Sequence, residues 1–202
     1  MKVLNLYAGI GGNRKLWKGH DITAVECDPA IAHVYRSSFP RDIVIVGDAH
    51  EYLLAHFQKF DLIWSSPPCP THGQYRYNVG VCAKGYKAVF PDMKLYEEIV
   101  FLQYYFKGHW VVENVKPYYE PLITPTAALQ RHLFWSNFSI ARADFGATHL
   151  RTKNKIADFA DAQAVTKSKI SNKRQVLRNC VDPQLGAHIM RCVVQPILTD
   201  PK

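Results

Sequence analysis

Short apolar runs alternate with amphipathic stretches along the first 115 residues of the chain. Continuous apolar runs are typical of buried strands, and apolar positions that recur every three or four residues are typical of helices. Their alternation predicts βαβ units and an α/β domain with a mainly parallel sheet. The expected strands are Val3–Ala8, Ile22–Val25, Ile43–Val46, Leu62–Ser65 and Trp110–Val112, and the expected helices are Pro29–Phe39, His50–Phe57 and Lys94–Phe106.

The hydrophobic pattern is weaker in the second half of the chain. His132–Trp135 and Phe138–Ala141 predict two strands joined by a hairpin at Ser136-Asn137. Pro183–Leu198 returns to helical spacing and predicts a helix packed on the core. Residues 69–92 predict a long loop, and a loop of this length in a compact domain usually has a function.

Positive charge is concentrated in one segment. The chain has 202 residues and a net charge of +8, and the segment Arg151–Arg178 contains eight basic residues against two acidic ones. Such a segment can neutralise the phosphates of a nucleic acid and release counterions. A solvated positive face is the alternative interpretation.

The spacing of the cysteines and the length of the apolar runs indicate the cell compartment in which the protein is expected. The five cysteines are odd in number and widely spaced, so they form neither a disulfide framework nor a zinc motif, and we expect no metal. No apolar run approaches the ~20 residues that span a bilayer, and the start of the chain resembles a strand rather than a signal peptide. We therefore expect a cytoplasmic protein without a membrane partner.

One cysteine is mounted in an unusual way. Cys69 lies in the segment Trp64-Ser65-Ser66-Pro67-Pro68-Cys69-Pro70, directly after a predicted strand. Proline restricts φ and lacks a backbone donor, so the prolines stiffen the chain and direct the thiol. This favours a nucleophilic thiol, while a buried, inert cysteine in a tight turn remains the alternative.

Three predicted strands end in groups that suit an adenosine-type ligand. In an open α/β sheet, ligands bind at the carboxyl ends of the strands. The first strand is followed by a glycine turn, which we expect to open a helix and to let a ligand approach the backbone. The second strand is followed by acidic residues, and a carboxylate there suits the hydroxyls of a ribose. The third strand is followed by a carboxylate that suits the amine of an adenine. The absence of a Lys-Ser/Thr ending disfavours a triphosphate. These segments are Gly9-Ile10-Gly11-Gly12, Glu26-Cys27-Asp28 and Gly47-Asp48-Ala49.

A carboxyl and a guanidinium are expected near the thiol. Glu113 ends the fifth predicted strand, which lies near the fourth in a doubly wound order, and Arg131 follows at the start of the next strand. A thiol and an acid in one pocket suit nucleophilic addition to an electron-poor ring. Taken alone, Glu113 also fits a surface acid or a helix-cap partner.

Together these segments resemble the cytosine-C5 DNA methyltransferase family. The first motif of that family resembles residues 4–12, and the second and third resemble the two acidic strand ends. Ser66–Pro70 resembles the nucleophile motif, Glu113-Asn114-Val115 the Glu-Asn-Val motif, and Gln130-Arg131 a shortened glutamine–arginine motif. The resemblance covers residues 4 to about 135 in the order of the family. It implies a Rossmann-like, S-adenosylmethionine-dependent methyltransferase fold with a reduced target-recognition segment.

The resemblance also implies roles for individual residues. Cys69 would add to C6 of a flipped cytosine, Glu113 would bind its N3/N4 edge, and Arg131 would hold its carbonyl, with Pro68 and Asn114 supporting the site. S-adenosylmethionine would be the methyl donor and S-adenosylhomocysteine the product. The residues expected to bind the donor are Tyr7, Gly9, Ile10, Gly11, Gly12, Glu26, Cys27, Asp48 and Ala49.

The sequence departs from the family in two places. Asn5 and Tyr7 stand where the family usually has aspartate and phenylalanine, although a tyrosine ring can still stack on an adenine. Only the short basic segment stands where the family usually has a separate target-recognition domain, which suggests a compact, phage-like enzyme, by analogy with restriction-modification methyltransferases. We expect a catalytic domain at residues 1–145, a DNA-contacting segment at 146–179, and a C-terminal helix at 180–202 that packs back on the domain.

The expected partner is double-stranded DNA, bound by a monomer in a bacterial or phage-infected cell. Basic and aromatic residues in the long loop and in the basic segment would contact the phosphates and fill the space left by the flipped base. Two alternatives remain: the same chemistry on transfer RNA, and a non-catalytic nucleic-acid-binding relative. The residues expected to contact DNA are Tyr75, Arg76, Tyr77, Lys84, Lys87, Lys153, Lys155, Lys173 and Arg174.

Overall fold

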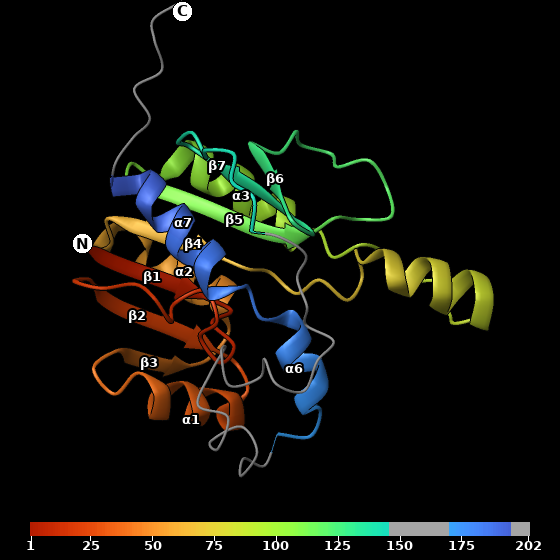
Figure 1. Ribbon diagram of the computed structural model, residues 1–202, viewed down its shortest axis with the longest axis horizontal. Coiled ribbons are helices and arrows are strands. Elements are labelled where there is room, and N and C mark those ends of the chain that lie inside the picture. Colours follow the sequence, from red (N-terminus) through yellow and green to blue (C-terminus); the bar gives the residue numbers. More distant parts are fainter. Residues whose placement is uncertain (146–169, 195–202) are drawn as a thin grey trace, which may run out of the picture.

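A seven-stranded, mostly parallel sheet forms the centre of the protein (Figure 1). The computed structural model describes residues 1–145 and 170–194. The strand order is β3-β2-β1-β4-β5-β7-β6, with β7 antiparallel to β5 and β6 antiparallel to β7. The strands are β1 Lys2–Leu6, β2 Asp21–Glu26, β3 Ile43–Val46, β4 Leu62–Ser65, β5 His109–Val115, β6 Ala127–Leu129 and β7 His132–Ser136.

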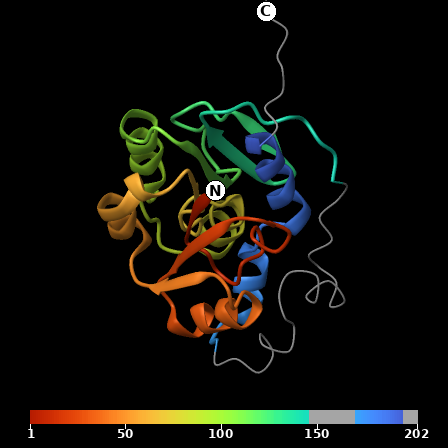
Figure 2. The same ribbon diagram turned by 90° about the vertical axis from the view of Figure 1, so that its left-hand side faces the viewer.

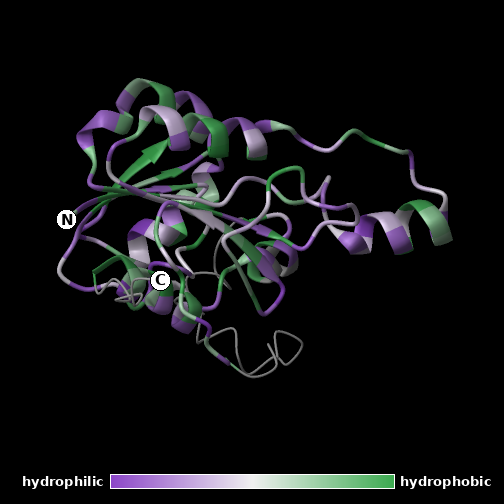
Figure 3. Ribbon diagram, turned by 90° about the horizontal axis from the view of Figure 1, so that it is seen from above, coloured by the Kyte–Doolittle hydropathy of each residue, from purple (hydrophilic) through white to green (hydrophobic). Residues whose placement is uncertain are grey.

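Helices cover both faces of the sheet (Figures 1 and 2). On one face, Leu4 and Leu6 pack with α2 and α3 in a common core. On the other face, Val3 and Trp64 pack with α7, and Ala24 packs with α1. Alternate residues of β1 therefore serve the two cores, and the apolar strands lie inside the molecule (Figure 3). The helices are α1 Pro29–Ser38, α2 Ala49–His56, α3 Lys94–Tyr105, α6 Lys173–Asn179 and α7 Pro183–Val194, with short helices η1 Phe57–Lys59 and η2 Arg76–Ala83.

Two helices begin at an aspartate that follows a strand. Asp28 accepts hydrogen bonds from the backbone N–H groups of Ala30 and Ile31 at the start of α1. Asp48 caps α2 in the same way through its Oδ1. Capping satisfies backbone donors that have no partner within the helix, and this explains why both helices begin where the strand pattern stops.

The expected helix after the glycine turn is absent. Residues 12–16 form successive turns, and the backbone of Asn13 lies directly against α7. Asn13 also forms a buried side-chain pair with Asn5, and Trp17 donates its indole N–H to the Gly186 carbonyl at 3.1 Å. The close approach of α7 therefore occupies the space in which a helix would have to pack.

The expected hairpin at Ser136-Asn137 is also wrong. The partner of β7 is the preceding strand β6, and the two-residue connection is Gln130-Arg131, where Gln130 has a φ of +52°. Asn137 instead accepts a hydrogen bond from the Trp110 backbone N–H at 3.0 Å and donates one to the Gly108 carbonyl. These two hydrogen bonds hold the start of β5. Because β7 pairs with β6, Arg131 lies in the tight turn between them, at the carboxyl edge of the parallel strands.

The long loop contains a helix that was not expected. Residues 76–83 form a π-helix within the long loop of residues 69–92. This loop forms an arm that projects from the carboxyl edge of the sheet (Figures 1 and 3). Gly80 allows the Tyr86 ring to pack against the helix, since a Cβ there would lie 2.8 Å from that ring.

Among the described helices, none is both long and apolar enough to cross a membrane.

Helix α7 packs so closely on the backbone of Asn13 that it requires a glycine at position 186. A Cβ at Gly186 would lie 2.2 Å from the Asn13 carbonyl oxygen, which belongs to the backbone. Although alanine normally favours a helix over glycine, we expect Gly186→Ala to lower the free energy of unfolding by about 1–3 kcal/mol. Urea denaturation measures this change. Gln184→Ala, at an exposed position of α7, is the control; a stabilising Gly186→Ala would contradict the docking of α7.

Candidate active site

One cavity joins the predicted donor site and the predicted nucleophile. It has a volume of about 250 Å³ and lies at the carboxyl edge of the parallel strands. The end of each of four strands contributes to it, because parallel strands direct their carboxyl ends to the same edge. Its lining includes Tyr7, Gly9, Ile10, Gly12, Glu26, Cys27, Pro68, Cys69, Glu113, Asn114 and Arg131.

The donor half of the cavity is built around Glu26. One carboxylate oxygen accepts the backbone N–H of Gly9 and the other accepts that of Asp28, each at 2.9 Å. These bonds hold the carboxylate at the cavity wall, with acceptor capacity left on both oxygens for a ligand with two hydroxyls. Gly9 has a φ of +56° and open space where a Cβ would lie, so a ligand can approach its backbone closely. The residues present therefore fit an adenosine-type donor.

Three predicted donor residues lie elsewhere. A Cβ at Gly11 would lie 2.3 Å from the Phe39 ring, so this glycine is required by the packing of α1. Asp48 is outside the cavity lining and caps α2, with Lys94 at 3.8 Å, while Ala49 is buried in the core on the α2 and α3 face. Their expected contact with the donor stays a prediction, as does that of the Asp48 carboxylate with an adenine amine.

The nucleophile half holds the thiol, the carboxyl and the guanidinium together. Cys69 is partly buried at the end of the β4 loop, and Glu113 is 6% exposed on β5. Arg131 enters the same cavity from the β6–β7 turn and donates to the Cys180 carbonyl at 3.5 Å. Asn114 donates to the Pro67 carbonyl at 3.0 Å and so ties β5 to the proline loop.

Burial controls the protonation of this group. It raises the pKa of Glu113 to about 7, against the opposing effects of a Ser66 hydrogen bond and of Arg131. Burial also raises the pKa of Cys69, the negative charge of Glu113 raises it further, and Arg131 lowers it. At neutral pH the thiol therefore keeps its proton in the unliganded protein.

Sequence reasoning missed several residues of this cavity. His132 lies with its Nε2 3.6 Å from the Glu113 carboxylate, but burial lowers its pKa to about 3, so the pair is not an ion pair at neutral pH. Its position directly after Arg131 was the only available signal. Val176, Asn179 and Val181 close the cavity from the C-terminal part of the chain, and no local pattern indicated that contact.

The predicted DNA-contacting residues of the long loop, Tyr75, Arg76, Tyr77, Lys84 and Lys87, lie outside the cavity lining. Tyr75 is 69% exposed on the arm, and Lys84 and Lys87 are exposed beyond it. Arg76 donates to the Lys87 carbonyl, and Tyr77 stacks on Tyr118 with ring centroids 4.4 Å apart, so both also hold the arm together. Lys153 and Lys155 lie outside the described residues, and Lys173 and Arg174 belong to α6.

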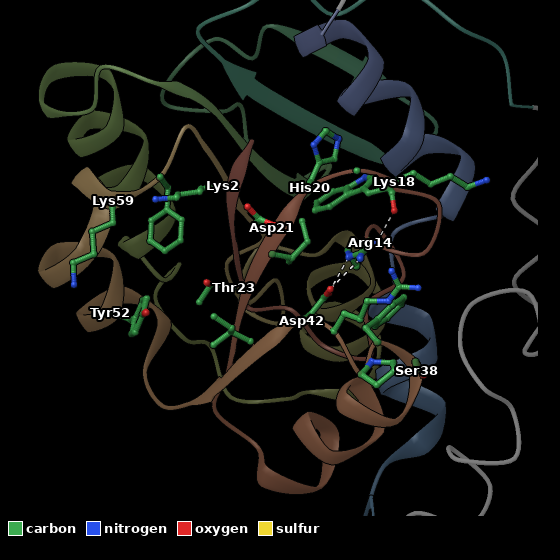
Figure 4. A pocket seen from close by; sticks show the side chains of 18 residues that line it. Lys2, Arg14, Lys18, His20, Asp21, Thr23, Ser38, Asp42, Tyr52 and Lys59 are labelled. Atoms are coloured by element: carbon green, nitrogen blue, oxygen red, sulfur yellow. Dashed lines mark hydrogen bonds and ion pairs between the residues drawn. The ribbon is translucent and has the colours of Figure 1, made fainter.

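A larger hollow lies at the opposite end of the sheet (Figure 4). Its volume is about 1010 Å³, and it is lined by the amino ends of β1, β2 and β3. Arg14 lies inside it but is held by Asp42 at 2.8 Å and by the Trp17 carbonyl (Figure 4). Ligands of open α/β sheets bind at the carboxyl ends, so the smaller cavity is the candidate site. Among residues 1–145 and 170–194, no group of His, Cys, Asp and Glu could hold a metal ion.

The fold is that of Rossmann-like methyltransferases. The model of the C-5 cytosine-specific DNA methylase family matches residues 1–100 of the chain. No curated protein matches the sequence.

Solved structures of methyltransferases are similar to part of the chain. A protein described as a DNA modification methyltransferase encoded within an E. coli prophage is 23% identical over 59% of this chain and 33% of its own, with a TM-score of 0.39. DNMT2 from Spodoptera frugiperda is 24% identical over 57% of this chain and 35% of its own, with a TM-score of 0.40. Dnmt2 from S. pombe is 15% identical over 81% and 55%, with a TM-score of 0.46. The chain thus spans about a third of the first two structures.

The raised pKa of Cys69 makes a prediction about its reactivity. We expect alkylation of this thiol by iodoacetamide to rise only at alkaline pH, and Glu113→Gln to shift the rise to lower pH because a neighbouring negative charge is removed. Peptide mass spectrometry across a pH series measures the rate at each cysteine. Cys82, which is exposed on the arm, is the internal control. Equal pH dependence at Cys69 and Cys82 would contradict the effect of burial.

Proposed function

We propose that the chain is an S-adenosylmethionine-dependent DNA methyltransferase that methylates C5 of a flipped cytosine. The observation that carries this proposal is the single cavity shared by Glu26, Cys69 and Glu113. A donor held at Glu26 and a base held at Glu113 would meet there, next to the thiol.

The residues of the cavity suit a covalent mechanism. The Cys69 thiol would lose its proton to the Glu113 carboxylate, its sulfur would form a bond to C6 of the base, and the electrons of the C5–C6 double bond would move toward C5. Glu113 would keep a proton at N3 so that the ring accepts the electrons, and Arg131 would hold the carbonyl oxygen. The donor, when bound, supplies the methyl group to C5. Removal of the C5 proton would then restore the double bond and expel Cys69.

Duplex DNA with 5-fluorocytosine tests the mechanism, because fluorine at C5 cannot leave as a proton. We expect a denaturant-resistant complex between the chain and this DNA, formed only with S-adenosylmethionine present and absent in Cys69→Ala. Gel electrophoresis detects the complex, and mass spectrometry locates it. Cys82→Ala is the control and should form it normally, since this cysteine lies on the arm outside the cavity.

The same experiment separates the substrates. Random-sequence DNA avoids a need to know the recognised site, and total tRNA with 5-fluorocytosine is tested in parallel. A complex with tRNA alone would replace DNA by RNA as the substrate. If S-adenosylhomocysteine binds but no complex forms with either nucleic acid, the chain is a non-catalytic binder and the proposal is wrong.

The protonation states of Glu113 and Cys69 lead to a prediction for how kcat/KM depends on pH. The reactive form carries one proton between the two groups, so kcat/KM falls where both are protonated, below about pH 7. Activity should therefore rise with pH through about 7. Glu113→Gln should lower kcat/KM by about 10²–10⁴-fold and remove this acidic limb. An unchanged limb in Glu113→Gln would show that another group titrates there.

A further inference from the structure

A carboxylate lies buried beneath the donor half of the cavity. Glu98, on α3, has no exposed surface and accepts hydrogen bonds from three other elements. The Tyr7 hydroxyl donates to it at 2.5 Å, and the Ser65 hydroxyl donates to it at the same distance. The His50 Nδ1 lies 3.1 Å from it. Because these residues follow β1, end β4 and begin α2, Glu98 joins the strand ends that surround the donor cavity.

Tyr7 is the member of this group that lines the cavity itself. Its φ of +53° is a left-handed conformation that a side chain with a large ring rarely adopts, so its placement depends on its contacts. Burial and the neighbouring Glu98 raise the pKa of Tyr7, so its hydroxyl remains a donor. The bond to Glu98 therefore fixes the far end of the side chain of a residue that lines the cavity.

Neighbouring hydrogen-bond donors offset the free-energy cost of burying the Glu98 carboxylate. A buried carboxylate requires donors or a counter-charge, and His50 offers both. The hydrogen bond to Glu98 raises the pKa of His50 above its usual range, against the effects of burial and Lys94. Glu97 lies on the other side of the ring, with its Oε2 3.7 Å from the His50 Nε2. The group is thus a connected network in which loss of one donor weakens the hold on the others.

We propose that Glu98 is a positioning residue for the methyl donor, acting through its hydrogen bond to Tyr7. The family resemblance leads one to expect phenylalanine at this position, and the hydroxyl is what this chain adds. Without the hydroxyl, the ring would lose its anchor and Glu98 would keep a buried oxygen with one donor fewer. The inference deepens the proposed function, because it assumes that the cavity binds S-adenosylmethionine or its product.

Direct binding of S-adenosylhomocysteine tests this without any methyl transfer. Isothermal titration of the full chain compares the unaltered protein with Tyr7→Phe, Glu98→Gln and the double variant. We expect Tyr7→Phe to raise Kd about tenfold, as loss of one hydrogen bond to a charged group would. Glu98→Gln should weaken binding in the Tyr7 protein but add little in Tyr7→Phe, because Glu98 acts through the hydroxyl.

Tyr96→Phe is the matched control. It removes a hydroxyl on the same helix, which accepts the Leu122 backbone N–H at 3.2 Å and lies outside the donor cavity. It should lower the melting temperature as Tyr7→Phe does but leave Kd unchanged, which separates positioning from general stability. A Kd for Tyr7→Phe within twofold of the unaltered chain, or an equal effect of Glu98→Gln in both backgrounds, would overturn the inference alone. No binding by the unaltered chain would overturn the donor assignment with it.

Discussion

The parallel hydrogen bonding of β1, β2, β4 and β5 is the constraint on which the rest of the structure depends. Leu6 is in register with Val25 on one side and with Ser65 on the other, and Ser65 is in register with Val112. Each strand therefore ends at nearly the same level of the sheet. The chain can place a glycine loop, the Glu26 carboxylate, a thiol and an acid around one cavity only because these four ends coincide.

Burial then gives the groups at that edge their chemical character. Glu113 is enclosed by β5, β7 and the proline loop, and its pKa rises into the neutral range. Cys69 shares the enclosure and holds its proton more firmly for the same reason. Near neutral pH Glu113 therefore titrates while Cys69 keeps its proton, and Arg131 opposes both upward shifts in pKa. Buried groups with shifted pKa values that share one cavity are typical of functional sites.

A second layer of polar groups supports this edge from below. Glu98 reaches the ends of β1 and β4 and the start of α2, while Asn114 reaches the proline loop from β5. Bonds of this kind hold loops that would otherwise have few apolar contacts. The cavity is thus positioned by buried hydrogen bonds as much as by the hydrophobic cores on the two faces of the sheet.

The sequence by itself determined the parallel strands, their flanking helices and most of the candidate residues that line the cavity. Apolar runs such as Ile43–Val46 and Leu62–Ser65 appear in the structure with the bounds that their pattern predicts, because strand and helix periodicity are local properties. Contacts between distant segments decided the rest. The packing of Gly186 on Asn13 replaced the helix expected after the glycine turn. The pairing of β7 with β6 placed Arg131 in its turn, and Glu98 was recognisable only once three strand and helix ends met around it, because a buried hydrogen bond leaves no periodic pattern in the chain.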